Sequence, residues 1–411
     1  MSRPATRTAI LYISYDGVLE PLGDSQVVAY LERLAPDVRI CLLSFEKPVD
    51  FDARDRVQAM EQRLARRGVR WVPLRYHRRP AVLSTVWDVV RGVVRARREC
   101  RASGVRIIHA RSYVPALMAL GSRGASGARF LFDMRGFWVD EKVEAGHWKA
   151  NGLLVRVGKY WERRFFHAAD AIVSLTAEGV RAFAELGYDI SSRVAVEVIP
   201  TCVDLERFTI SDKDPRLLSE LGLAGGPVFG CVGTMSNWYL RDEMLVYLGE
   251  LARRFPSARL LIVTRENHDA LRRDAAARRV PLDRLVLTQA TFADMPRYVG
   301  LFDAGVFFIR PALSKRGSAA TKLAEFLACG VPVIINAGVG DSGEIVNQHG
   351  VGVVLDALDA VSRDWSFTAV AEVLRDPGMR DRCRRTAMEL FDIQTGAARY
   401  RGLYERLDRP G

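Results

Sequence analysis

The strongest constraint on the fold is a series of short apolar runs, each long enough for one strand, which alternate with amphipathic helical patterns and restart midway. The first series is "AILYISY", "RICLLSF", "VRWVPLRY", "RIIHA", "RFLFDM", "AIVSL" and "VAVEVIP". The second series is "VFGCVG", "ARLLIVTR", "RLVLTQA", "DAGVFFIR", "PVIIN" and "GVVLD". Near-continuous Val, Ile and Leu runs are typical of parallel strands buried on both faces. We therefore predict an α/β protein with two Rossmann-like, doubly wound parallel-sheet domains.

A chain of 411 residues is long enough for two separate cores. We predict an N-terminal domain at 1–203, a hinge near 200–206 and a C-terminal domain at 204–392. The last helix, at about 393–411, carries Tyr400, Leu403 and Leu407 on one face and is expected to pack back on the first domain. Two such domains that face each other create a cleft at the C-terminal ends of their strands, where we expect the ligands.

Cysteine usage and hydropathy indicate a cytoplasmic protein. The six cysteines are scattered without a C-x-x-C pair, which favours a reducing compartment and argues against a zinc site or a disulfide framework. The first residues, "MSRPATRT", are too few for a signal peptide, and no apolar run approaches the length of a membrane span. We expect a chain that is neither exported nor membrane-spanning.

The net charge of +11 is concentrated in residues 51–106, which hold 15 basic and 5 acidic residues. This segment contains two helical patterns, and in the second we expect a buried face made of Val86, Val89, Val90, Val93 and Val94. The basic surface is either a solvated face or an attachment to an anionic membrane. Nucleic acid is not expected as a partner, since aromatic residues do not interleave with these charges.

The stretch "SAATKLAEFLACGVPVIIN", residues 318–336, predicts an anion site. It follows a strand and opens a helix, whose first amide groups and dipole favour a bound anion. Cations crowd the approach and suit a diphosphate; they are Arg310, Lys315, Arg316 and Lys322. The structural alternative is that Ser318 caps the helix and Lys322 forms an ordinary surface ion pair with Glu325.

Glu325 adds a second ligand-binding feature to this helix. It lies four residues after Thr321, so the two share a face, and it does not occupy the glutamate position of a capping box. A carboxylate in this place can accept paired hydrogen bonds from the hydroxyls of a ribose beside the phosphates. The combination indicates a sugar nucleotide.

At this point the chain resembles a known family. "TKLAEFLACGVPVIIN" is similar to the donor motif of retaining GT-B glycosyltransferases of glycosyltransferase family 4, in the subset that reads S-x-x-T-K-x-x-E. The resemblance extends over most of the chain and in the family's order. It includes "YDGVLEPLGDSQVVAYLERLA", "IIHARSYVPALMAL", "FDMRGFWVDE", "VIPTCVDLERF", "VGTMSNWYLRDEML" and "NAGVGDSGEIV".

The resemblance implies that Glu325 binds the donor ribose, and that the backbone around Ser318, Ala320 and Thr321 holds the diphosphate. It also implies that Gly23, in a glycine-bearing loop after the first strand, lets the backbone approach the phosphates. A plain turn at Gly23 with Asp24 as a helix cap is the structural alternative.

Four residues of the first domain are expected near the substrates. Arg135 falls where many relatives place a histidine near the donor sugar, and a cation there can hold the leaving diphosphate or orient the acceptor. A structural salt bridge between Asp133 and Arg135 is the alternative. His109 and Arg111 follow a strand and are expected at the rim of the cleft, in contact with the acceptor together with Asp133.

The sequence departs from the family pattern in two places. Many members have a glutamate eight residues before the one matched by Glu325, but this chain has Gly317. Relatives also often place an arginine and a lysine roughly where Thr234 and Tyr239 stand here. The candidates for the missing charge are Arg310, Lys315, Lys322 and Arg241, while Thr234 remains a predicted donor contact.

The resemblance implies transfer of a sugar, with retention of configuration, from a nucleotide-diphosphate sugar to a glycan or lipid-linked acceptor at the inner face of a bacterial membrane. UDP is the default carrier, and neither a metal nor another cofactor is expected. Arg135, Arg310 and Lys315 are the predicted catalytic residues, because a leaving diphosphate needs cations. Two alternatives remain. A nucleotide-sugar 2-epimerase needs acid/base carboxylates, for which no clear pair stands out, and Gly317 motivates a non-catalytic nucleotide-sugar-binding relative.

Overall fold

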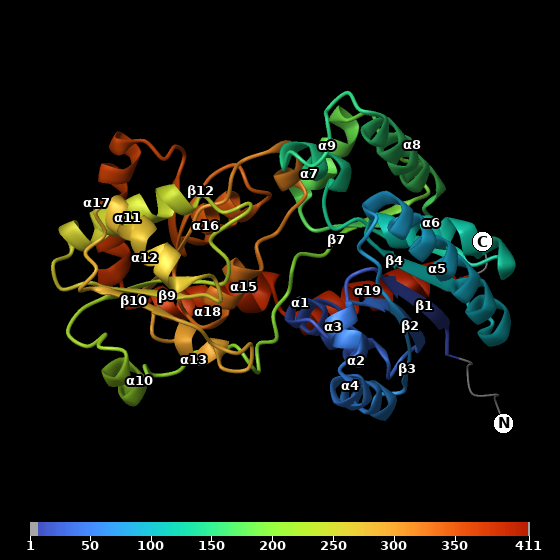
Figure 1. The fold of residues 1–411 in the computed structure, drawn as a ribbon, viewed down its shortest axis with the longest axis horizontal. Helices are drawn as coiled ribbons and strands as arrows, with labels where there is room; N and C mark the ends of the chain where they lie inside the picture. The colour runs from blue at the N-terminus through green and yellow to red at the C-terminus, as the bar shows by residue number, and fades with distance from the viewer. Residues whose placement is uncertain (1–6, 410–411) are drawn as a thin grey trace. The chain divides into compact units, whose positions relative to one another are not determined.

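The computed structural model describes residues 7–409 in two compact units. The N-terminal unit extends to Pro200 and resumes at Ile393, and the C-terminal unit comprises Thr201–Asp392. Each unit has its own parallel sheet (Figure 1). Each also has its own hydrophobic core. All thirteen apolar runs predicted as strands are strands in the described residues, and the predicted fold class is confirmed.

The described part of the N-terminal unit contains a seven-stranded sheet in the order β3-β2-β1-β4-β5-β6-β7, with every neighbouring pair parallel. Its strands are β1 (Ala9–Ser14), β2 (Arg39–Glu46), β3 (Val69–Arg75), β4 (Ile107–Arg111), β5 (Arg129–Asp133), β6 (Ala171–Ser174) and β7 (Ala195–Val198). The order reverses between β1 and β4. Because crossover connections are right-handed, this reversal places the helices before and after it on opposite faces of the sheet.

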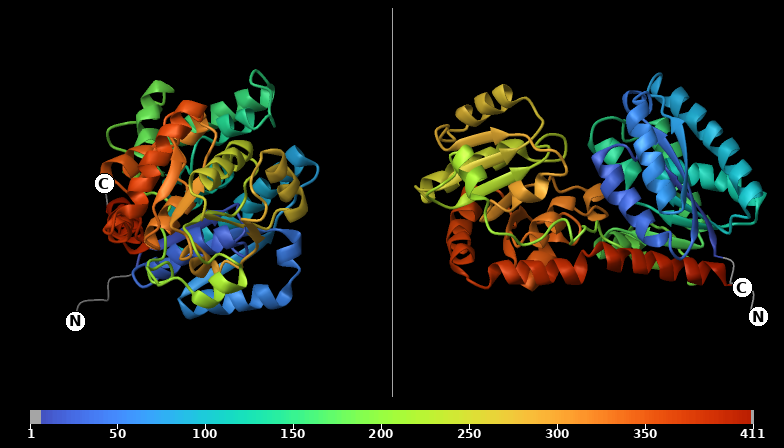
Figure 2. Two further views of the ribbon diagram at one scale, coloured as in Figure 1. Left: turned by 90° about the vertical axis from the view of Figure 1, so that its left-hand side faces the viewer. Right: turned by 90° about the horizontal axis from the view of Figure 1, so that it is seen from below.

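The helices of this unit follow that rule. One layer contains α5 (Ala81–Ser103), α6 (Tyr113–Ser122) and α8 (Leu153–Ala168), with α6 in contact with both neighbours. The opposite layer includes α2 (Ala29–Leu34) and the last helix α19 (Ile393–Asp408), which contacts α2 and β4 (Figure 2, right). The remaining elements are α1 (Pro21–Gly23), η1 (Asp24–Val28), α3 (Pro48–Phe51), α4 (Arg54–Arg66), η2 (Arg123–Ala125), α7 (Trp138–Glu144) and α9 (Ala177–Glu185).

The predicted buried face of α5 is only partly correct. Val89 and Val93 pack against the core of the unit, but Val86, Val90 and Val94 are 55%, 50% and 45% exposed. The helix contacts α6 and the sheet with a different side, on which Gly92 and Ala96 are buried. A valine-rich periodicity showed which residues share a side of the helix but not which side faces the sheet.

The described part of the C-terminal unit contains a six-stranded parallel sheet in the order β10-β9-β8-β11-β12-β13. Its strands are β8 (Val228–Val232), β9 (Arg259–Val263), β10 (Leu285–Thr288), β11 (Ala304–Phe307), β12 (Val333–Asn336) and β13 (Gly352–Leu355). Its helices are α10 (Pro215–Glu220), α11 (Arg241–Arg254), α12 (His268–Ala277), α13 (Met295–Val299), α14 (Leu313–Arg316), α15 (Thr321–Ala328), α16 (Ser342–His349), α17 (Ala360–Arg375) and α18 (Met379–Leu390). The order reverses between β8 and β11, so the loops after these two strands lie at the position where ligands bind in such sheets.

Two further findings concern the whole described chain. Each of the six cysteines is buried and forms no disulfide within the described residues. Among residues 7–409, no helix combines the length and the apolar character that crossing a bilayer requires.

Candidate functional site

The loop that follows β8 forms the first part of the site in the C-terminal unit. Gly233 turns the chain there with a φ of +76°, a conformation that glycine adopts without strain. The next residues, 234–240, carry no charge. Glu266 holds this loop, because its carboxylate accepts hydrogen bonds from the amides of Met235 (3.0 Å) and Ser236 (3.1 Å) and from the hydroxyl of Thr234 (2.5 Å).

Glu266 was missed by sequence reasoning, since nothing in its local sequence connects it with residues 234–236. Burial alone would raise the pKa of Glu266, but the hydrogen bonds from Ser236, Thr234 and the Met235 amide outweigh it and lower the pKa. The ionised carboxylate also pairs with Arg241 at 3.2 Å. Arg241 contacts Asp274 at 2.9 Å as well, so two carboxylates already compensate this candidate donor-binding cation.

Three of the predicted cations gather around the same loop. The ammonium of Lys322 donates a hydrogen bond to the carbonyl oxygen of Thr234 (3.1 Å) and lies 3.5 Å from the centre of the Tyr239 ring. Lys315 lies 3.7 Å from the centre of the Trp238 ring, over which Arg310 also lies, at 5.2 Å. The loop has no cation of its own, and Lys322 extends one to it from α15.

Helix α15 begins at Thr321, three residues later than the sequence predicted. Its N-cap residue is Ala320, and no side chain of the described residues caps it. The structural alternative in which Ser318 caps the helix is wrong, because Ser318 donates its hydroxyl to the carbonyl oxygen of Ser314 (3.2 Å). Thr201 donates to the carbonyl oxygen of Ala319 (3.2 Å) and so holds this segment from outside the helix. The first turn of α15 therefore keeps uncapped amide groups beside Lys322.

Lys322 and Glu325 are not a surface ion pair, because the two residues are only 8% and 9% exposed. Burial lowers the pKa of Lys322 to about 8, although Cys231 and Glu325 act in the opposite direction. Burial raises the pKa of Glu325 to about 7, against the charges of Lys322 and Arg207. No described residue donates a hydrogen bond to the Glu325 carboxylate, which leaves its oxygens available to the hydroxyls of a ligand.

Because its pKa is raised, Glu325 should change the free energy of unfolding with pH in the opposite direction to a carboxylate whose pKa is lowered by folding. The folded protein binds more protons than the unfolded chain between pH 4.5 and about pH 7, so the free energy of unfolding should fall as the pH rises through this window. At pH 8, Glu325→Gln should raise the free energy of unfolding by up to about 3 kcal/mol. Chemical denaturation of wild type and variant at pH 5 and pH 8 measures this; equal pH dependence in both proteins would contradict it.

The predicted residues of the N-terminal unit form one buried cluster. His109 and Arg111 lie within β4, so the expectation that they follow a strand is wrong. His109 is 1% exposed and Arg111 is 4% exposed. The Nδ1 atom of His109 lies 2.7 Å from the hydroxyl of Tyr404, and the hydroxyl of Tyr400 donates to Asp133 at 3.0 Å. The last helix, α19, therefore contributes two tyrosines to this cluster.

The charges of the cluster are incompletely paired. The Asp133 carboxylate lies 3.5 Å from His109 Nε2 and 3.9 Å from the guanidinium of Arg135. Burial alone would raise the pKa of Asp133, but Arg135 and His109 outweigh it and lower the pKa. Burial lowers the pKa of His109, so the ring stays neutral at physiological pH. The Nε and Nη1 atoms of Arg111 have no hydrogen-bond partner among the described residues.

Arg135 has a φ of +60°, which is uncommon for a residue with a side chain. Such strain persists only where the surroundings hold it, and it is frequent at functional sites. The guanidinium lies near Asp133 at a distance longer than a hydrogen bond, so the ion pair weighed as a structural alternative is loose. Two arginines and one aspartate thus leave this cluster with an excess positive charge.

Gly23 is required by close packing within the N-terminal unit. A Cβ atom at this position would lie 2.0 Å from the carbonyl oxygen of Gly17. The loop that approaches it is held by Glu46, whose buried carboxylate accepts from the amides of Val18 (3.0 Å) and Leu19 (3.2 Å). A contact of Gly23 with donor phosphates remains a prediction.

Asp24 does not cap a helix at this turn. Its side chain pairs with Arg63 at 2.7 Å, and the short helix α1 has Glu20 at its N-cap. Arg63 also pairs with Glu32 at 2.8 Å. These contacts fix α4 to the turn, so part of the positive charge of segment 51–106 is compensated inside the unit.

Comparison with known proteins identifies the two units. Residues 25–202 match the family described as glycosyl transferase 4-like domain, and residues 226–375 match the glycosyl transferases group 1. Over 221 residues the chain is 29% identical to GDP-mannose-dependent alpha-(1-6)-phosphatidylinositol monomannoside mannosyltransferase of Mycolicibacterium smegmatis. That alignment covers 52% of this chain and 56% of the relative, so the chain spans about half the length of the curated relative it matches.

Solved structures agree on the fold. The glycosyltransferase of Rickettsia africae aligns with a TM-score of 0.72 and 14% identity, over 98% of this chain and 100% of that chain. HepE of Anabaena, solved in complex with UDP and glucose, aligns with a TM-score of 0.69 and 16% identity, over 96% and 99% of the two chains. Since the two family matches occupy both units in order, and the fold agrees over nearly the whole chain, this protein belongs to the GT-B glycosyltransferases of family 4.

Proposed function

We propose that this protein transfers a sugar from a nucleotide-diphosphate sugar to an acceptor, with retention of the anomeric configuration. The observation that carries the proposal is the start of α15, where uncapped amides, the buried Lys322 and a carboxylate without hydrogen-bond donors among the described residues lie within one turn. This arrangement suits a diphosphate followed by a ribose. Its chemistry matches the family to which the chain belongs.

In this proposal the amides near Ser318, Ala320 and Thr321 bind the diphosphate, and Lys322 neutralises it. The ribose hydroxyls donate to Glu325. Arg310 and Lys315, which lie over Trp238, stabilise the negative charge that develops as the sugar–phosphate bond breaks. Fixed dipoles and cations aimed at a developing charge are a large source of catalysis, and they need no nucleophile from the enzyme.

Retention and the absence of a metal or cofactor requirement are parts of the proposal that follow from the family. A donor phosphate oxygen then takes the proton of the attacking acceptor hydroxyl on the same face of the sugar. In the N-terminal unit, Arg111 and Arg135 are proposed to contact the acceptor, and His109 and Asp133, each 1% exposed, are proposed to act through them as positioning residues. Arg111 supports this proposal, because a buried guanidinium without a hydrogen-bond partner among the described residues is costly unless a ligand pairs with it.

The donor is proposed to be a UDP-sugar. HepE, which shares the fold, is solved with UDP and glucose, whereas the mannosyltransferase relative is named for GDP-mannose. The acceptor is proposed to be a glycan or a lipid-linked intermediate of cell-surface polysaccharide or glycolipid synthesis, reached from the cytoplasmic side of a membrane. Gly317 replaces the glutamate that many relatives use at the sugar, so the sugar that this protein transfers has to be determined by experiment.

A panel of nucleotides and sugar nucleotides tests the donor. A true donor present at 100 times its dissociation constant should raise the free energy of unfolding by about 2.7 kcal/mol, because it binds only the folded protein. Thermal unfolding with UDP-sugars, GDP-sugars and the free nucleotides measures this shift. Adenosine monophosphate at the same concentration is the control, since it lacks the diphosphate. No shift with any nucleotide diphosphate would contradict the proposal.

Product analysis separates transfer from the alternatives. The protein is incubated with the stabilising donor, with and without a lipid and glycan extract. Transfer predicts free nucleoside diphosphate and a glycosylated product that forms only with the extract. An epimerised sugar nucleotide in the sample without acceptor would identify an epimerase, and tight binding with no product in either sample would identify a non-catalytic binding protein.

A further inference from the structure

On α5 and α8 the acidic side chains are buried and basic side chains are exposed. The acidic residues of the two helices, Asp88, Glu99 and Glu162, are buried, with exposures of 0%, 3% and 0%. The basic residues are at the surface instead. The exposed ones are Arg97, Arg98 and Arg101 on α5, and Arg156, Arg163, Arg164 and His167 on α8. The outward charge of this pair of helices is therefore entirely positive.

The same two helices also expose large apolar side chains. On α5 the exposed large apolar residues are Val82, Leu83, Val86, Trp87, Val90 and Val94. On α8 they are Leu153, Leu154, Val157, Tyr160 and Trp161. Contiguous apolar surface bordered by polar residues marks an interaction site, whereas singly scattered apolar residues do not.

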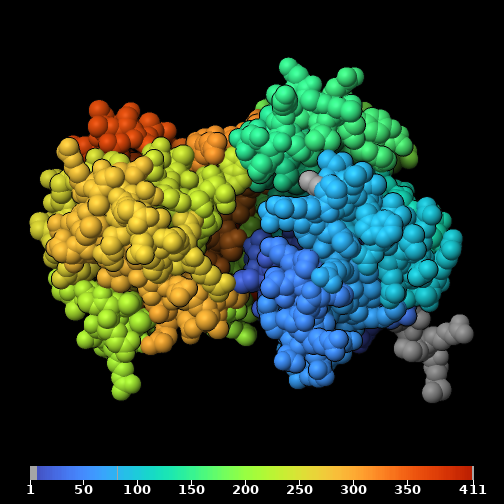
Figure 3. Space-filling model, viewed as in Figure 1, coloured from blue at the N-terminus to red at the C-terminus, as the bar shows by residue number. Residues whose placement is uncertain are grey.

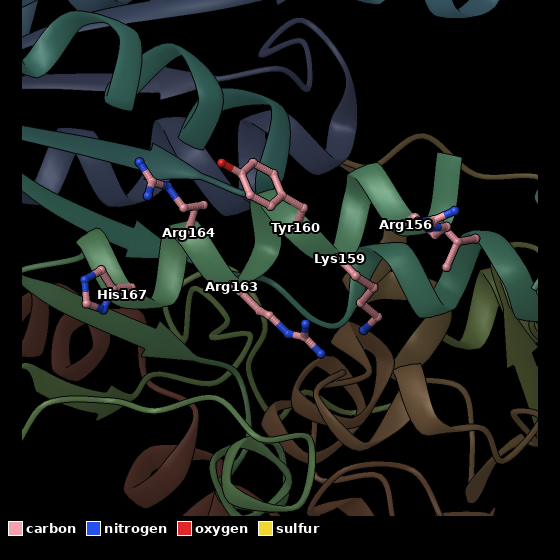
Figure 4. A pocket seen from close by; sticks show the side chains of 7 residues that line it. Arg156, Lys159, Tyr160, Arg163, Arg164 and His167 are labelled. Carbon is pink, nitrogen blue, oxygen red and sulfur yellow. The ribbon is translucent and has the colours of Figure 1, made fainter. Parts of the chain in front are cut away.

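The helical periodicity of α5 places its exposed apolar residues and its exposed arginines on the same side of the helix. On α5, the apolar residues recur at three- and four-residue spacing, and Arg97, Arg98 and Arg101 continue the same side of the helix. On α8, a shallow pocket is lined by Arg156, Lys159, Tyr160, Arg163, Arg164 and His167, together with Val155. Figure 4 shows these side chains leaving α8 on both sides, with Tyr160 and Arg164 on one and Lys159 and Arg163 on the other.

Both helices belong to one layer of the N-terminal unit. They flank α6, which contacts each of them, and they cover the same side of the sheet. Figure 3 presents α5 in light blue and α8 in green on one face of this unit. The exposed apolar and basic residues of the two helices form what we call the α5–α8 surface.

We propose that the α5–α8 surface docks on the headgroup region of an anionic lipid bilayer. Helices that lie in this region combine apolar and aromatic residues with lysine or arginine, and tryptophan and tyrosine are enriched at that depth. Each cation near an anionic surface contributes to binding, and here no exposed carboxylate of α5 or α8 opposes it. A second copy of the chain fits less well, since a two-fold contact would place this positive surface against itself.

The α5–α8 surface coincides only in part with residues 51–106, for which the sequence suggested a membrane contact. Within that segment, Arg63 on α4 is paired with Asp24 and Glu32. The apolar part of the contact belongs to α5 and to α8, which lies outside the segment. Docking here would bring the enzyme to a lipid-linked acceptor, and in that sense it rests on the proposed function. Binding to lipid can be measured without donor or acceptor, so the two proposals can fail separately.

Vesicle sedimentation of the full chain tests the surface. Vesicles contain phosphatidylcholine alone or with about one third phosphatidylglycerol, at about 0.05 M and about 0.5 M salt. Wild type should bind the anionic vesicles at low salt, and binding should weaken at high salt. The double variant Arg163→Gln, Arg164→Gln should bind about 30-fold more weakly, because each lost charge costs about fivefold. The variant Trp87→Ser, Trp161→Ser should bind at least about tenfold more weakly, because it loses apolar contact with the bilayer.

Matched controls use exposed residues elsewhere. Arg66→Gln, Arg67→Gln changes two exposed arginines at the end of α4, and Trp365→Ser changes a tryptophan that is 59% exposed on α17. Both should bind like wild type. Thermal shift with the nucleotide donor confirms that each variant is folded and keeps the donor site.

Three outcomes would overturn the proposal. One is wild-type protein that stays in the supernatant with anionic vesicles at low salt. Another is equal loss of binding in the α4 and α8 variants, which would indicate general charge attraction. The third is a stable dimer in light scattering that Trp87→Ser, Trp161→Ser dissociates, which would make the surface a self-interface.

Discussion

Replacing Glu325 with alanine is expected to lower kcat/KM for the sugar nucleotide by about 100-fold, which corresponds to about 2.7 kcal/mol. The carboxylate is 9% exposed and has no hydrogen-bond donor among the described residues, so its oxygens are free to pair with the ribose. Hydrogen bonds to a charged acceptor are the strong ones, and the buried position excludes competing water. The thermal shift by nucleotide should be lost together with activity.

The glutamine variant separates charge from shape at this position. Glu325→Gln should be more stable than wild type at pH 8 but should bind the donor more weakly, because an amide accepts hydrogen bonds less strongly than a carboxylate. Glu372→Ala, on the exposed side of α17, serves as the control and should change neither property. Unchanged nucleotide affinity in Glu325→Ala would remove this residue from the site.

Replacing Lys322 with methionine is expected to lower kcat by about 100- to 1,000-fold, the range found when one group that stabilises a developing oxyanion is removed. The ammonium lies 3.1 Å from the carbonyl oxygen of Thr234 and 3.5 Å from the Tyr239 ring centre, at the end of the loop after β8. That loop has no charged side chain from 233 to 240, so the charge of a leaving diphosphate there must be compensated from outside the loop, by Lys322 together with Arg310 and Lys315. Methionine retains the length and the apolar contacts but not the charge.

Proton uptake on nucleotide binding distinguishes a role of Lys322 in binding the diphosphate from a purely structural role. Burial lowers the pKa of Lys322 to about 8, and a bound diphosphate should raise it again. Above pH 8, nucleotide binding to wild type should therefore take up protons, which calorimetry in buffers of different ionisation enthalpy measures. Lys322→Met should lose this uptake, and Lys149→Met, at an exposed position of the N-terminal unit, should keep it. Equal uptake in both variants would contradict the assignment.

Local sequence predicted the strands and helices of this protein better than it predicted which of their sides are buried. Each strand was recognisable because a strand buried on both faces needs an uninterrupted apolar run, whatever lies beside it. The valines of α5 show where this reasoning ends. Their spacing identified a helix and its sides, but Val86, Val90 and Val94 are exposed because contact with α6 and the sheet uses another side.

For the candidate site too, local sequence predicted some features and missed those that depend on distant residues. The sequence of residues 318–325 predicted the start of a helix that carries a cation and a carboxylate, and Lys322 and Glu325 do lie together on α15. Their burial, and hence their shifted pKa values, arises from contacts with residues distant in the sequence, such as Thr234 and Tyr239. Glu266 was not recognisable, because an acid that holds a loop 30 residues away leaves no local pattern.

The sequence by itself determined two parallel α/β sheets, their strand positions and the helix that starts the donor motif, because these depend on hydrophobic periodicity and on short-range backbone preferences. Only the tertiary structure decided which polar groups are desolvated and which apolar ones stay exposed. It buried Lys322, Glu325 and Arg111 and left Val86, Val90 and Val94 of α5 at the surface. The physical reason is that burial and electrostatic environment depend on neighbours brought together by folding, which a local pattern does not contain.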